Sequence, residues 1–213
     1  KTEREKEIIN AEYNMYKEDL SSVASRVLLR NMYRIPELYE DILGTAESIS
    51  RITTSALEQM HRNFYTAATM SLVLVGSFDE TALITKIAGW LDELAGNGKH
   101  RPEILPLGES EGGVVSAEQR LELPYSTSSF WLGYRSKMRN GSARREGSEL
   151  LRSRVAGQLV LAMLIGPGSQ AFEEFYADGL VDESLSFSYT VEPEYAYLMI
   201  SGDSMQPERA AEK

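Results

Sequence analysis

The sequence contains no cysteine and only two histidines among its 213 residues. Without cysteine the chain has no disulfide framework, no thiolate metal site and no cysteine nucleophile, a composition that fits a reducing compartment. Neither an HExxH nor an HxxEH string is present. A zinc site built from this chain alone is therefore not expected, because zinc needs three or four protein ligands. We interpret His61 as a helix-surface residue and His100 as a linker residue.

Long hydrophobic runs are missing as well. The longest apolar stretches, such as residues 159–165, are far shorter than the roughly 20 residues that a spanning helix needs. No apolar run follows the first residues, so we expect no signal peptide. The formal net charge is -10, from 32 acidic and 22 basic residues. Such an acidic balance argues against general binding of nucleic acid or of anionic membranes.

The first half of the chain has the apolar spacing of helices. Apolar residues recur at steps of three and four, and this spacing predicts one helix over residues 3–34. The recurring residues are Ile9, Tyr13, Tyr16, Leu20, Val23 and Val27. No cap precedes Glu3, so we expect that this helix has been cut. A second helix is predicted from residue 54 or 55 to residue 65, with Ser55 and Glu58 at capping-box spacing.

A strand and a linker are predicted next. Residues 70–75 (MSLVLV) are apolar at positions on both faces, which is typical of a buried central strand. Asp79 can cap the helix that follows. The composition then shifts to glycine and proline, so we expect a linker at residues 96–113 between one structural unit at 1–95 and another at 114–213.

The second half alternates strands and helices without a strict order. We predict strands near residues 119–123, 128–134, 185–189 and 195–199, and helices over residues 147–165 and 169–177. Residues 207–213 look like the first turn of a further helix. This pattern indicates the α+β class, with a mostly antiparallel sheet and helices packed on one face.

Two glutamates of the first helix are candidates for chemistry. Glu5 and Glu12 are seven residues apart, so they lie on nearly the same face of a helix. A carboxylate close to a buried stripe can act as a ligand or a base, since reduced solvation tunes its proton affinity. From spacing alone, however, a solvated helix face is the better interpretation.

Four strings carry a family resemblance that covers most of the chain. EREKEIINAEYNMYKED (residues 3–19) resembles the distal glutamate helix of the pitrilysin/insulinase family of zinc metallopeptidases. TMSLVLVGSFD (69–79) resembles a family strand, and YEDILGTAESISRITTSALEQMHRNFY (39–65) resembles the segment that precedes it. GPGSQAFEEFYADGLVDESLSFSY (166–189) resembles a segment of the next family repeat. The strings follow the family's order, and the likeness is greatest to bacterial cytoplasmic members.

The resemblance implies a fold and a metal site. Family members are chains of similar α+β repeats that enclose a chamber, in which zinc is held by an HxxEH helix and by a glutamate of a later helix. By motif match that glutamate is Glu12, and Glu5 matches a second glutamate with a supporting role near the metal. The resemblance further implies zinc as the cofactor of the complete protein, peptides as substrates, and a cytoplasmic location.

The sequence departs from the family pattern in two ways. The HxxEH helix is absent, so we expect this chain by itself to be inactive and to hold no zinc. The substrate-binding Arg/Tyr pair of the family is also absent, since those positions read Phe175 and Asp182. Two other interpretations stay open: a non-catalytic domain or subunit that binds peptide or a partner subunit, and a generic α+β interaction domain.

The motif order also predicts how the chain divides. It would be the back half of one repeat followed by the front half of the next, so its partners would be the remaining repeats or a sister subunit. Each half alone leaves apolar strand surface unpaired. We therefore expect residues 70–75 to join the later strands in one sheet, as a permuted repeat.

Overall fold

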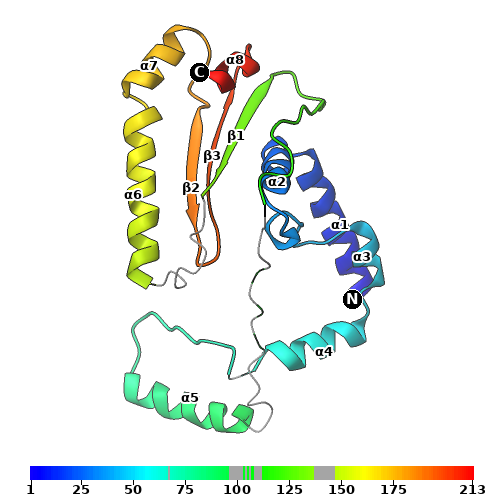
Figure 1. Cartoon of the computed structure of the whole chain (residues 1–213). Coiled ribbons are helices and arrows are strands. Elements are labelled where there is room, and N and C mark those ends of the chain that lie inside the picture. Colours follow the sequence, from blue (N-terminus) through cyan, green and yellow to red (C-terminus); the bar gives the residue numbers. More distant parts are fainter. Residues whose placement is uncertain (67, 96–102, 104, 106, 108–111, 137–146) are drawn as a thin grey trace. The chain divides into compact units, whose positions relative to one another are not determined.

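The computed structural model (Figure 1) describes residues 1–66, 68–95, 103, 105, 107, 112–136 and 147–213. The chain forms two compact units. The first unit comprises Lys1–Asn14 and Ile42–Pro106, and the second comprises Met15–Asp41 and Leu107–Lys213. Helix α1 (Thr2–Glu18) contributes residues to both units.

The first half of the chain is helical. Its elements after α1 are α2 (Leu20–Met32), the 3-10 helix η1 (Pro36–Leu38), α3 (Ala46–Arg51), α4 (Thr54–Phe64) and α5 (Glu80–Ala95). The predicted single helix over residues 3–34 is wrong, because the chain breaks at Asp19. The Asp19 carboxylate accepts a hydrogen bond from the Ser22 amide at 2.6 Å while its own backbone is extended, so it caps a new helix. Hydrogen bonds from the side chain and the amide of Ser22 also lower the pKa of Asp19.

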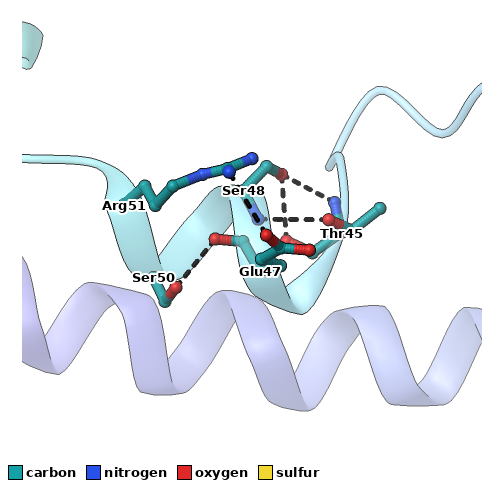
Figure 2. A network of polar contacts seen from close by, with 5 residues as sticks. All are labelled: Thr45, Glu47, Ser48, Ser50 and Arg51. Atoms are coloured by element: carbon teal, nitrogen blue, oxygen red, sulfur yellow. Dashed lines mark hydrogen bonds and ion pairs between the residues drawn. The ribbon is translucent and has the colours of Figure 1, made fainter.

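Threonines begin the two short helices that follow. Thr45 and Ser48 form a reciprocal capping box at the start of α3, and Arg51 pairs with Glu47 one turn further on (Figure 2). The Thr53 hydroxyl accepts from the Ala56 amide and caps α4. The predicted capping box at Ser55 is therefore wrong, because the earlier hydroxyl already serves the first turn.

Two predicted strands are absent. Residues 70–75 are exposed and form neither helix nor strand, and among the described residues they pair with no strand. The expectation that they join the later strands in one sheet is therefore wrong. Residues 119–123 form no strand either, since this stretch is tied to the end of α2 through the Asn31 side chain, which donates to Gln119. Apolar spacing indicates that a segment is suited to burial, but it does not indicate whether a partner strand is present.

The elements from residue 129 onward match the prediction closely. They are β1 (Ser129–Arg135), α6 (Gly147–Ile165), α7 (Gln170–Ala177), β2 (Ser186–Val191), β3 (Ala196–Asp203) and α8 (Pro207–Glu212). The strands form an antiparallel sheet in the order β1-β3-β2, with Ser129 opposite Asp203 and Ser186 opposite Ser201. The α+β class with an antiparallel sheet is thus confirmed.

One face of the sheet is covered by the C-terminal helices. Helix α6 runs along β2 (Figure 1), and the ring of Tyr189 fills the space beside Gly157 of α6. A core cluster around Leu180 and Phe130 joins the start of β1 to α7 and α8. Other apolar residues of α6 are exposed, and they are Leu151, Val155, Leu159, Val160, Met163 and Leu164. Much of the apolar surface of this helix is therefore uncovered within the described residues.

Helix α2 covers part of the other face. An added Cβ at Gly133 of β1 would lie 2.6 Å from the Met32 sulfur, so the backbone of β1 lies directly against α2. At the end of α2 the buried Tyr33 hydroxyl donates to the Ala196 carbonyl at 2.9 Å. Burial raises the pKa of Tyr33 to about 12, although the Arg135 guanidinium near its ring acts in the opposite direction.

Candidate functional site

Helix α1 carries both predicted site residues on its exposed side. Its other side faces α3, where Lys6 donates to the Ser50 carbonyl at 3.0 Å. Tyr13 is the buried residue of this helix. Glu5 and Glu12 are exposed, and in the part of the chain that the structure describes their carboxylates take part in no ion pair or side-chain hydrogen bond. Both carboxylates are therefore available to a ligand.

The spacing of the two glutamates limits how they can share a metal. Seven residues of α-helix rise about 10 Å. A zinc ion lies about 2 Å from a coordinating carboxylate oxygen. One ion at this helix can therefore take Glu5 or Glu12 as a direct ligand, but not readily both. Ile8, one turn before Glu12, is also exposed, so this side of α1 combines a carboxylate with apolar surface.

The residues described do not complete a zinc site. No three His, Asp or Glu side chains among them lie close enough together to hold a metal ion. His61 is on the exposed surface of α4, as predicted, and its ring stacks on Tyr65 with centroids 4.8 Å apart. His100 lies outside the described residues. The described residues thus bring no imidazole close to the exposed carboxylates of α1.

A cavity of about 530 Å³ lies on the half of the sheet face that α2 leaves uncovered. It was not predicted from the sequence. The cavity extends from the first turn of α2, at Ser21, across all three strands of the sheet. Six of its residues are serines: Ser21, Ser129, Ser184, Ser186, Ser188 and Ser201. The signal in the sequence was the alternation of serine at Ser184, Ser186 and Ser188, which the sequence analysis did not use.

The polar groups of this cavity are mostly unused by the protein. Among the described residues, only the Ser184 hydroxyl has a hydrogen bond, which it accepts from the Asp203 amide at 2.7 Å. Trp131 of β1 lines the cavity, and its indole N–H is buried without a partner. A buried donor normally has an acceptor. The cavity therefore combines hydroxyl groups that both donate and accept with one carboxylate, that of Asp203.

The two positions that depart from the family pair have structural roles. Phe175 packs against the core cluster around Leu180. Asp182 accepts a hydrogen bond from the Ser184 amide at 2.8 Å, and the hydrogen bonds from Ser184 lower the pKa of this carboxyl. Neither residue offers the guanidinium or phenol that would bind a substrate at these positions.

No single helix in the described part of the chain is both long and apolar enough to cross a membrane. Helices α6 and α7, which meet at a bend of 44°, reach that length and composition only as a pair.

Comparison with known families decides the relationship. The model of the Peptidase M16 inactive domain matches residues 51–212, which is most of the chain. The chain belongs to the M16 peptidase family. The resemblance to the pitrilysin/insulinase peptidases, seen first in the four sequence strings, is therefore confirmed.

Individual M16 relatives are similar over nearly the whole chain. The uncharacterized zinc protease YmfH of Bacillus subtilis (strain 168) is 32% identical over 99% of this chain. The crystal structure of an M16-like peptidase from Alicyclobacillus acidocaldarius covers 99% of the chain at 26% identity with a TM-score of 0.73. The first half of the periplasmic protease PqqL from Escherichia coli covers 95% at 16% identity with a TM-score of 0.56, a likeness of fold alone.

The chain spans about half the length of these M16 proteins. It covers 48% of YmfH, 48% of the Alicyclobacillus peptidase chain and 42% of the PqqL chain. This agrees with the predicted relationship to part of a multi-repeat protease.

Proposed function

We propose that this chain is part of a zinc-dependent endopeptidase that hydrolyses peptides, and that Glu12 is its contribution to the metal site. The observation that carries the proposal is the exposed Glu12 carboxylate, without a partner among the described residues, on a helix of an M16 chain. A relative of this chain carries the name zinc protease. Glu5, one heptad earlier, has a supporting role near the metal.

The chain alone is proposed to be inactive. A catalytic zinc takes three protein ligands and keeps one open position. The sequence has no HxxEH string, so the two imidazoles and the base come from elsewhere in the complete protein. This chain then contributes a ligand but no base or nucleophile. The remaining repeats or a sister subunit are its partners, and the proposed location is the cytoplasm, in agreement with a sequence that lacks cysteine.

Metal content tests this proposal. We expect the complete protein to bind about one zinc ion per active site and to cleave an unfolded peptide, and a chelator to abolish cleavage until zinc is restored. The isolated 213-residue chain should do neither under the same conditions. The measurements are elemental analysis after gel filtration and cleavage of a quenched fluorescent peptide. A complete protein that cleaves peptide equally well without metal would contradict the proposal.

The cavity favours a second function, in which the second unit binds peptide without cleaving it. Peptide backbones offer amides and carbonyls, and the cavity presents unused serine hydroxyls that can donate to and accept from them. Asp203 disfavours an anionic ligand at the same place. A neutral, hydrogen-bonding chain such as an extended peptide is the ligand class that fits both facts.

Tryptophan fluorescence can test peptide binding. The chain has two tryptophans, so a Trp90→Phe background leaves Trp131 as the only reporter. Added unfolded peptide should shift the emission of Trp131. A Ser186→Ala/Ser201→Ala pair, which removes two hydroxyls that face each other across β2 and β3, should weaken binding about tenfold. Thr190→Val, on the same strand but outside the cavity lining, is the matched control. Unchanged emission, or equal affinity in the pair, would exclude this function.

A further inference from the structure

Asp203 is a half-buried carboxylate in the cavity on the uncovered half of the sheet face, which we call the serine-lined cavity. Within the described residues its side chain takes part in no ion pair and no hydrogen bond. No lysine or arginine among those residues lines the cavity. A carboxylate that is partly removed from water normally has a cation or several donors as neighbours, because its charge is otherwise poorly solvated. Asp203 therefore marks a place where a ligand can supply the opposite charge.

The backbone around Asp203 is held in place from two sides. Its own amide donates to the Ser184 hydroxyl at 2.7 Å, and the next amide, that of Ser204, donates to the Ser128 carbonyl at 2.9 Å. Ser184 is fixed in turn, because its amide donates to the Asp182 carboxylate at 2.8 Å. The base of the Asp203 side chain is therefore placed by the fold before any ligand binds.

A serine hydroxyl lies on each side of this carboxylate. The strand order is β1-β3-β2, and Ser129 of β1 lies directly opposite Asp203 of β3. Ser184, two residues before β2, contacts Asp203 from the other side. Residues directly opposite each other in an antiparallel pair have Cβ atoms about 5 Å apart and point to the same face. Ser129, Asp203 and Ser184 therefore form a row of oxygen acceptors at one end of the cavity, which we call the acceptor row.

The acceptor row suits a compact ammonium group. An ammonium has three N–H donors and no acceptor, whereas a hydroxyl oxygen can accept two hydrogen bonds. The Ser184 hydroxyl accepts one from the Asp203 amide and can still accept another. One ammonium above Asp203 can thus donate to the carboxylate and to a hydroxyl on each side. A guanidinium is a planar fork that pairs with a single carboxylate, so it fits three separate acceptors less well.

Apolar groups next to the acceptor row suit the chain that carries the ammonium. Trp131 lies two residues beyond Ser129 on the same face of β1, and both Trp131 and Met199 of β3 line the cavity. Lysine side chains bury their four-carbon stems on apolar surface and keep the charge at a polar end. The cavity therefore offers an apolar surface for an alkyl stem and acceptors for the ammonium at its end.

We propose that the acceptor row binds the alkylammonium group of a peptide in the serine-lined cavity, with Asp203 as the counter-ion. The inference rests on the proposed binding of peptide by the second unit. The group can come from a lysine side chain or from a free amino terminus, because both are primary ammonium groups. The net charge of -10 attracts cations to the whole chain, whereas the acceptor row defines one position for the ammonium.

Peptides that differ in one group test the proposal. The protein is the 213-residue chain with Trp90→Phe, in chelator, so that the fluorescence of Trp131 reports binding. The probes share a short Gly/Ser sequence and carry a central lysine with capped ends, a central norleucine with capped ends, or a central norleucine with a free amino terminus. At low salt at least one ammonium peptide should bind about tenfold more tightly than the capped norleucine peptide. About 0.5 M sodium chloride should remove most of this gain.

The two ammonium probes identify the source of the group. A gain with lysine alone assigns a side chain to the acceptor row, and a gain with the free terminus alone assigns the end of the peptide. Equal binding of all three probes would overturn the proposal. An arginine probe that gains as much as the lysine probe would also overturn it, since the row would then recognise charge without the shape of an ammonium.

Variants at Asp203 separate the acceptor row from the general charge of the chain. Asp203→Asn should lower the affinity for the ammonium probe to that of capped norleucine. Glu173→Gln, which neutralises an exposed carboxylate of α7 outside the cavity lining, should leave the preference intact. Asp203→Lys should reverse the preference, so that a probe with a central glutamate binds most tightly. Circular dichroism verifies the fold of each variant, and a folded Asp203→Asn chain that keeps the preference would contradict the assignment.

The outcomes also separate this inference from the function on which it rests. If no probe shifts the emission of Trp131, the second unit does not bind peptide and the ammonium site is wrong as well. If the capped norleucine probe binds and neither ammonium probe gains, peptide binding stands and the ammonium site alone is wrong.

Discussion

Glu12→Gln in the complete protein is expected to lower zinc content and peptide turnover by roughly 100-fold or more. Substitutions in the shell behind metal ligands already cost 10–100-fold. Loss of the negative charge of a direct ligand should cost at least as much, since an amide is a weaker ligand than a carboxylate. The measurements are elemental analysis of the purified variant and cleavage of an unfolded peptide at saturating zinc.

Two neighbours on α1 serve as controls for Glu12. Glu5→Gln should reduce turnover less, about tenfold, because the proposed role of Glu5 is to support the metal site and not to bind the metal directly. Glu7→Gln makes the same chemical change on an exposed position of another side of the helix and should behave as the parent. In the isolated chain, Glu12→Gln should change the free energy of unfolding by about 0.5 kcal/mol or less. Full zinc and turnover in Glu12→Gln would remove this residue from the site.

Gly157→Ala is expected to lower the stability of the second unit. An added Cβ would lie 1.9 Å from the Tyr189 ring, so α6 and β2 cannot keep their contact. Overpacking of this kind costs about 2 kcal/mol, which exceeds the gain of about 1 kcal/mol from the better helix propensity of alanine. Urea unfolding followed by circular dichroism should show the midpoint falling accordingly.

Gly89→Ala provides the matched control for Gly157. Gly89 also lies inside a helix, α5, but no atom lies within 4 Å of an added Cβ. There alanine should be neutral or stabilise by up to about 1 kcal/mol. Replacing Tyr189 by leucine in the Gly157→Ala background should restore part of the loss, because it frees the space beside the helix. Equal effects at both glycines would show that the contact with Tyr189 carries no energy.

Much of the second unit could be predicted from the sequence, because its elements are defined locally. The helix over residues 147–165 stops at Gly166, and the next helix is capped by Ser169, whose hydroxyl accepts from the Phe172 amide. The strands near Phe187 and Tyr197 show the alternation of a sheet with one covered face. Each of these signals lies within a few residues of the feature that it defines.

The first half of the chain was harder to predict for two physical reasons. At Asp19 the apolar spacing continues through the break, since a cap changes the direction of the chain without changing the pattern of burial. The apolar sequence of residues 70–75 predicts a buried strand, but within the described residues no partner strand pairs with it. Hydrophobic periodicity is the same for an apolar segment that is buried and for one that is exposed, so it cannot distinguish the two.

The candidate site was predicted only in part. Family motifs single out Glu5 and Glu12, and the structure leaves both carboxylates exposed, but nothing in it tests their role at a metal. The serine-lined cavity was missed because it depends on how far α2 extends over the sheet. That extent is set by tertiary contacts, such as that of Met32 with Gly133, which leave no local trace in the sequence.

The exposed apolar residues of α6 affect how stability data on this chain should be interpreted. Leu161 is buried, whereas Leu159, two residues earlier on the same helix, is 60% exposed. In the isolated chain, substitutions at Leu161 should change the free energy of unfolding, whereas substitutions at Leu159 should change it very little. If the exposed apolar residues of α6 are covered in the complete protein, natural selection should retain apolar residues at both positions. Sequence variation among relatives can thus disagree with mutational tolerance measured on this chain alone, without either being in error.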